Sequence, residues 1–96
     1  MVNDITFPTE FGVKWREWYL RPTIHAYYEI ADLGFDLYDV LSILEMGYEC
    51  SKGRRASGTI ERCIKKGKKE YRVVVVESYS YDLKEEVWII KHVGGK

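Results

Sequence analysis

Residues 59–77 read TIERCIKKGKKEYRVVVVE, and this stretch decides the expected fold. Four successive valines at 73–76 predict a central strand buried on both faces, because β-branched residues favour strands and unbroken apolar runs are typical of two-sided burial. Residues 59–64 alternate in polarity, which indicates a neighbouring strand. The lysine-rich segment 65–69 has a central glycine and predicts a hairpin turn between the two strands.

Two further segments extend this pattern. Residues 86–93 are rich in Val, Ile and Trp and predict a third strand after a turn at 78–84. We therefore expect an antiparallel meander over residues 59–93. The Gly and Ser residues of 48–58 predict a loop before it.

A helix pair is expected over residues 23–47. Thr23 stands at an N-cap position, and Gly34 is suited to the end of the first helix. Asp36 is the next N-cap candidate, and Asp39 adds negative charge to the first turn of the second helix.

Aromatic residues also recur at helical spacing before Pro22, which ends any helix that precedes it. They are Phe11, Trp15, Trp18 and Tyr19. We expect an extra N-terminal helix over 10–20. Residues 1–9 fit either an edge strand or an arm.

Together these segments predict one α+β domain over residues 1–96, in which N-terminal helices pack on a three- to four-strand antiparallel sheet. A chain of 96 residues with 46% hydrophobic content is large and apolar enough for one core. No apolar run is long enough to cross a bilayer, and the N-terminus lacks the pattern of a signal peptide. We expect a cytoplasmic protein with no membrane partner.

The two cysteines, Cys50 and Cys63, are expected to be reduced thiols, because two cysteines do not make a disulfide framework. A zinc site would need both of them together with His25 and His92, and this set lacks the paired short spacing that zinc sites show. We therefore predict no metal and no cofactor.

The formal net charge is zero, but the charges are unevenly distributed. Residues 1–51 carry nine acids and three bases (−6), residues 52–72 carry nine bases and two acids (+7), and the remainder carries four acids and three bases (−1). The nine bases are Lys52, Arg54, Arg55, Arg62, Lys65, Lys66, Lys68, Lys69 and Arg72. Such a block predicts nucleic-acid binding, since each neutralised phosphate releases counterions. The lysines of the turn fit solubility equally well, whereas arginine matches phosphate geometry better.

Each histidine has two interpretations. His25, near the start of a predicted helix, either helps bind an anion such as an RNA phosphate or is a partly exposed residue that packs on Tyr28 or Glu29. His92, near the end of the last strand, either donates a proton in catalysis or is a surface residue at the strand end.

The segments Thr23-Ile24-His25-Ala26, Leu33-Gly34-Phe35 and Asp39-Val40-Leu41 resemble the DUF4258-type domains. Over residues 21–93 the order of a His-Ala pair, two short helices and a meander is similar to that family. These domains are in turn similar to RelE/BrnT-type toxins, which are small RNases of toxin–antitoxin pairs. The resemblance implies a RelE-like fold, RNA (free or associated with the ribosome) as a partner, and an antitoxin protein as a second partner.

Toxins of the RelE group place an acid, an arginine and a late His or Tyr on the meander, where this chain has Glu61, Arg72 and His92. The resemblance implies a metal-independent endoribonuclease: Glu61 activates the ribose 2′-OH, Arg72 stabilises negative charge and His92 protonates the 5′-oxygen. The alternative is a non-catalytic protein-interaction domain, suggested by the acidic helical half.

Strand register decides whether this site can form. If Ile64 lies opposite Glu70, Arg62 faces Arg72 and Glu61 points to the other side of the sheet. If Ile64 lies opposite Lys69, Glu61 faces Arg72. A slip of one residue exchanges the faces, so both registers remain open.

Overall fold

The valine run lies in β5 (Lys69–Ser80), between β4 (Thr59–Lys66) and β6 (Glu85–Gly95). The computed structural model describes residues 12–50 and 57–95. All three strands are antiparallel neighbours, as the predicted meander requires. The first three valines of the run are buried, and Gly67 takes a φ of 63° in the turn between β4 and β5, a conformation that favours glycine.

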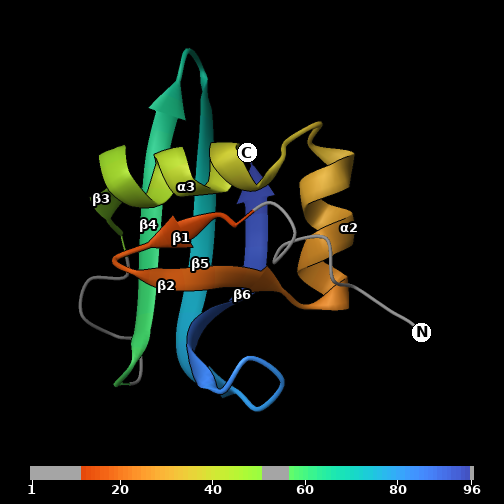
Figure 1. Cartoon of the computed structure of the whole chain (residues 1–96). Coiled ribbons are helices and arrows are strands. Elements are labelled where there is room, and N and C mark those ends of the chain that lie inside the picture. The colour runs from red at the N-terminus through yellow and green to blue at the C-terminus, as the bar shows by residue number, and fades with distance from the viewer. Residues whose placement is uncertain (1–11, 51–56, 96) are drawn as a thin grey trace.

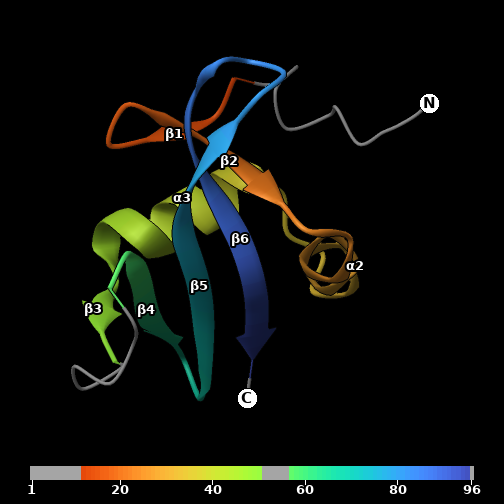
Figure 2. The same cartoon turned by 90° about the horizontal axis from the view of Figure 1, so that it is seen from below.

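The sheet as a whole is larger than predicted, and it is mixed. Six strands in the order β1-β2-β6-β5-β4-β3 curl into a half-barrel (Figure 1, Figure 2). The additional strands are β1 (Lys14–Trp15), β2 (Trp18–Pro22) and β3 (Tyr48–Glu49). Because β2 runs parallel to β6, the predicted three- to four-strand antiparallel sheet behind N-terminal helices is wrong. The meander runs across the sheet in the order β4, β5, β6, so its first strand lies beside β3 and its last strand lies beside β2.

The described part of the predicted helix over 10–20 is a β-hairpin. Trp15 lies opposite Trp18, and the turn residues Arg16 and Glu17 have φ values of 51° and 72°. Positive φ at both central residues is what a two-residue type I′ hairpin needs. Glu10 and Phe11, like residues 1–9, lie outside the described residues. The prediction failed because Trp15 and Trp18, three positions apart, are neighbours across a two-residue turn just as they would be on one face of a helix.

The hairpin closes over an indole cluster. The Trp88 ring lies 5.1 Å from that of Trp15 and 5.0 Å from that of Trp18, measured between centroids. Its Nε1–H donates to the Trp15 carbonyl oxygen at 2.9 Å, so the buried polar atom is satisfied. Burial of these large rings offsets the cost of ordering the N-terminal strands.

The helices α2 (Ile24–Asp32) and α3 (Leu37–Met46) lie within the segment predicted to contain them. The Thr23 hydroxyl accepts from the Ala26 N–H, and Asp36 and Asp39 form a reciprocal capping box. α3 lies across β4 and β5, while α2 lies along β6 (Figure 1). Neither helix of the described residues has the length and apolar character needed to cross a membrane.

A disulfide joins Cys50 to Cys63, so the prediction of two reduced thiols is wrong. The segment expected to be a loop contains β3, whose Tyr48 pairs with Cys63 on β4. This pairing leaves the two Cα atoms 5.9 Å apart, within the range that a disulfide spans. The covalent link fixes the β3 edge of the sheet.

Candidate functional site

The observed register differs from both alternatives, yet it unites the predicted acid and arginine. Ile64 lies opposite Tyr71, and Cys63 lies opposite Arg72. Glu61 is two residues from Cys63 and therefore shares its face, diagonally adjacent to Arg72. The Arg72 Nε lies 3.3 Å from Glu61 Oε2, and the two side chains are 37% and 7% exposed.

Arg62, predicted to contact nucleic acid, points to the opposite face. It pairs with Val73, which belongs to the core beneath α3. Its Nη1 donates to the Leu44 carbonyl oxygen at 3.3 Å, and its guanidinium lies 5.6 Å from the Trp15 ring centroid. The guanidinium is thus directed towards the helix and the hairpin, away from Arg72.

His92, the predicted proton donor, lies on the same face as Glu61 and Arg72. It pairs with Val74, which is opposite Glu61 across the other strand pair. A methyl group added at Gly94 would lie 2.8 Å from the His92 Nε2, so the imidazole rests against the Gly94 backbone. A side chain at 94 would therefore displace the imidazole from this position.

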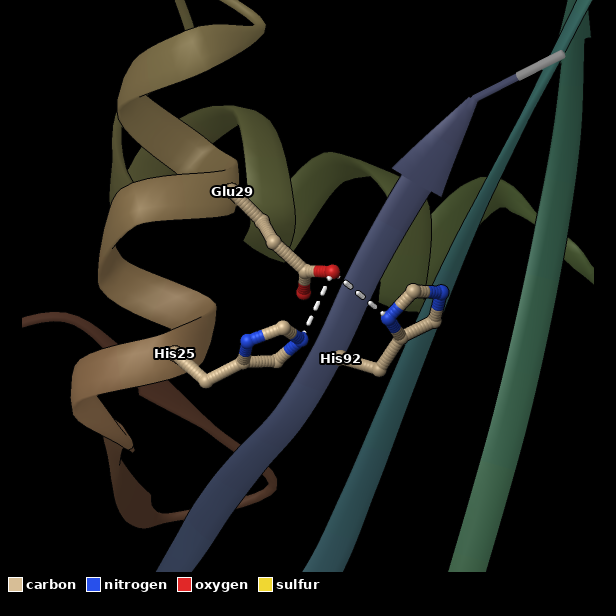
Figure 3. Close-up of side chains that lie close together, drawn as sticks. All are labelled: His25, Glu29 and His92. Carbon is tan, nitrogen blue, oxygen red and sulfur yellow. Dashed lines mark ion pairs between the residues drawn. The ribbon is translucent and has the colours of Figure 1, made fainter.

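His92 also contacts a residue that the sequence prediction did not include among the site residues. Its Nδ1 lies 2.9 Å from Glu29 Oε2, and the same oxygen lies 3.0 Å from the His25 Nε2 (Figure 3). The other Glu29 oxygen accepts from the Val93 N–H at 2.8 Å. The contact between His25 and Glu29, four residues apart on α2, is the one that the second interpretation of His25 expected. The contact with His92 depends on how α2 docks on β6.

Two cavities flank Arg72. One, of about 240 Å³, is lined by Glu70, Arg72, His92, Gly94 and Gly95. The other, of about 460 Å³, is lined by Tyr48, Glu49, Cys50, Glu61, Cys63, Glu70 and Arg72. Arg72 and Glu70 therefore separate a cavity that contains His92 from one that contains Glu61. The Tyr48 hydroxyl donates to Glu70, and this hydrogen bond raises the pKa of the Tyr48 phenol.

The remaining predicted cations are placed differently. Lys65, Lys66, Lys68 and Lys69 are exposed at the tip of the β4–β5 hairpin. His25 is the second residue of α2, with its ring 72% exposed and paired with Glu29. Arg54 and Arg55 lie outside the described residues. Of the cations placed by the structure, Arg72 is therefore the one that meets the acid and lines both cavities.

Comparison with known proteins gives no further guide. No protein-family model, curated protein or solved structure matches this chain.

Proposed function

We propose that this domain binds RNA and cleaves it, as an RNase of the RelE-like kind. The observation that carries the proposal is that Glu61, Arg72 and His92, from three adjacent strands, share one face of the sheet. That face presents an acid, a fixed cation and an imidazole beside two cavities. These are the groups that phosphodiester transfer from a ribose 2′-hydroxyl needs.

The proposed step needs no metal. Glu61 removes the proton of the 2′-OH, the 2′-oxygen forms a bond to phosphorus, and the bond from phosphorus to the 5′-oxygen breaks. His92 transfers a proton to that leaving oxygen, and a 2′,3′-cyclic phosphate remains on the other fragment. Arg72 stabilises the charge on the phosphoryl oxygens during transfer. The Glu29 carboxylate accepts the Nδ1–H of the His92 imidazolium and orients the ring, so that the Nε2–H is the proton given to the leaving oxygen.

The exposed lysines of the β4–β5 tip would supply non-specific phosphate contacts next to this face. Purified protein incubated with single-stranded RNA, and separately with ribosomes, tests the proposal. His92→Gln is expected to slow cleavage by about 100-fold or more, because loss of a general acid costs 10²–10⁴-fold. Gly94→Ala is expected to slow it as well by displacing the ring, whereas the exposed control Lys91→Ala leaves the rate unchanged. Absence of cleavage together with absence of salt-dependent RNA binding would reject the proposal.

A toxin role is part of the proposal, with an antitoxin protein as partner and the cytoplasm as its location. The Cys50–Cys63 disulfide weighs against a permanently reducing compartment, since cytosolic thiols are mostly kept reduced. Alkylation of the protein in intact cells, followed by mass measurement, determines which state exists there. A fully oxidised pair in cells would argue against the cytoplasmic location, while leaving the RNA chemistry to be tested separately.

The second candidate is a non-catalytic protein-interaction domain. It is favoured by the apolar surface of α2, where Ile24 and Tyr28 are each 61% exposed. This candidate predicts that Tyr28→Ser weakens a protein complex and that His92→Gln does not. A protein that stays monomeric and recovers no partner from its own cells would reject it.

A further inference from the structure

The two histidines of the chain meet at one carboxylate oxygen. His25 and Glu29 are one turn apart on α2, and His92 comes from β6, more than sixty positions later in the chain. Figure 3 shows both rings directed at Glu29, the His25 ring from the same helix and the His92 ring from β6. The ring centroids are 6.4 Å apart and the rings are nearly parallel. This arrangement differs from a simple surface ion pair because one oxygen serves two imidazole nitrogens.

We propose that His25, Glu29 and His92 form a binding site for a divalent transition-metal ion, with zinc as the ion that fits the ligand set. Imidazole nitrogen and carboxylate oxygen are common zinc ligands, and two His with one Glu is a known three-ligand set. The ligand atoms of the three residues all lie within 4.8 Å of one another. Ligands about 2.0–2.1 Å from a metal stand about 2.9–3.4 Å apart at angles of about 90–110°. The two nitrogen-to-oxygen distances of 3.0 and 2.9 Å fall in that range.

The outer contacts are those that a metal site requires. Glu29 Oε1 accepts the Val93 N–H, which fixes the carboxylate and leaves Oε2 for the ion. The absence of a side chain at Gly94 leaves room for the His92 ring in this position. The rings of His25 and His92 are 72% and 42% exposed, so solvent reaches the site and water can complete the coordination.

Cys50, Glu61 and Cys63 form a second group of possible metal ligands. Metal binding by this group can be distinguished from binding by the first group, because it requires that the disulfide be reduced. Metal binding by cysteine needs the thiolate, and both sulfurs are used in the disulfide. Under non-reducing conditions, the set around Glu29 is therefore the one of these two groups, within residues 12–50 and 57–95, that has all three ligand atoms available. The inference does not rest on RNA cleavage, because it concerns the folded chain and the ion alone.

The experiment is a titration of the full, chelator-stripped chain without reductant. Zinc binding is followed by calorimetry, and cobalt binding by visible absorption. We expect one ion per chain. His25→Ala, His92→Ala and Glu29→Gln should each weaken binding by about 100-fold or more, since even outer contacts of a metal cost 10–100-fold when lost. Asp32→Asn changes an exposed carboxylate at the end of the same helix and should leave the affinity unchanged.

His25→Ala is the decisive variant, because its ring is largely exposed and its loss leaves the packing of β6 intact. Circular dichroism of each variant checks that the fold is kept. Absence of zinc binding in the wild-type chain, unchanged binding in His25→Ala, or the intense near-ultraviolet band of cobalt–thiolate bonds would each overturn the inference. RNA cleavage measured in chelator is a separate readout, so failure of the RNase proposal and failure of the metal site are distinguishable.

Discussion

Two polar clusters lie on this sheet, and they differ in how they are held together. The imidazole cluster (His25, Glu29 and His92) links a helix to β6 through one carboxylate and is open to solvent. The disulfide cluster (Cys50, Glu61, Cys63 and Arg72) links β3, β4 and β5 through a covalent bond and an ion pair whose acid is nearly buried. The side chains of the imidazole cluster are exposed enough to bind a ligand from solvent. Those of the disulfide cluster are held by a covalent bond and by an ion pair with a buried acid.

The difference indicates a division of roles. In the disulfide cluster a substitution should lower the free energy of unfolding, because it removes the cross-link or the Arg72 cation beside the buried Glu61 carboxylate. In the imidazole cluster a substitution should mainly change what the protein binds. Arg72 lines the cavity on either side and so connects the two clusters.

Opening the disulfide should have the largest effect on stability. The bond joins cysteines 13 positions apart, and for a loop of this size the chain-entropy model gives about 3 kcal/mol. Chemical unfolding with and without reductant measures this difference. The double variant Cys50→Ser/Cys63→Ser should be insensitive to reductant and match the reduced protein. An unchanged unfolding midpoint on reduction would show that the cross-link does not stabilise the folded chain.

Arg72→Met should have the next largest effect. It removes the cation beside the buried Glu61 carboxylate, and we expect a loss of about 2 kcal/mol, reduced from the value for a fully buried pair because Arg72 is partly exposed. Urea unfolding measures it, with Lys65→Met as an exposed control on β4. The double variant Glu61→Gln/Arg72→Met should recover part of the loss. Equal losses in Arg72→Met and Lys65→Met would contradict this account.

The sequence could predict the parts of the fold that depend on local signals, and it could not predict the part that depends on tertiary contacts. The helix pair and the three long strands carry strong local signals, namely Thr23 and Asp36 as caps and the valine run of β5. The N-terminal hairpin does not, because the spacing of Trp15 and Trp18 fits both a helix and a two-residue turn. Its strand identity is decided by Trp88, which comes from the far end of the chain.

For the candidate site, likewise, the strands that carry the residues could be predicted, but the contacts between those residues could not. Glu61, Arg72 and His92 were correctly expected on the meander strands, but their shared face depends on a register that local pattern leaves open. A register irregularity between Val74 and Val75 also determines which face His92 takes. The disulfide was missed because β3, a strand of two residues, carries no signal of its own. Glu29 was missed as a site residue because its second partner is supplied by tertiary packing alone.

Glu29→Ala should have a smaller effect on stability, of about 1 kcal/mol, because the buried Val93 N–H loses its acceptor. Glu29→Gln keeps an amide oxygen at that position and should be nearly neutral. Thermal unfolding of both variants separates the hydrogen bond from the charge. If the two variants lose the same stability, the charge of Glu29 rather than its contact with Val93 fixes α2 on β6.

Tyr48→Phe should have the smallest effect, and its dependence on pH is diagnostic. The hydrogen bond to Glu70 raises the pKa of the Tyr48 phenol above its ordinary value of 10.0, so the folded chain binds that proton more tightly than the unfolded chain. The stabilisation is therefore complete below the unfolded-state pKa and is lost as pH rises through the folded-state pKa. Unfolding midpoints of wild type and Tyr48→Phe should differ slightly at neutral pH and converge in strong alkali, with Tyr81→Phe as the exposed control. A difference that grows with pH would show that Tyr48 stabilises the fold through something other than the proton that it donates to Glu70 on β5.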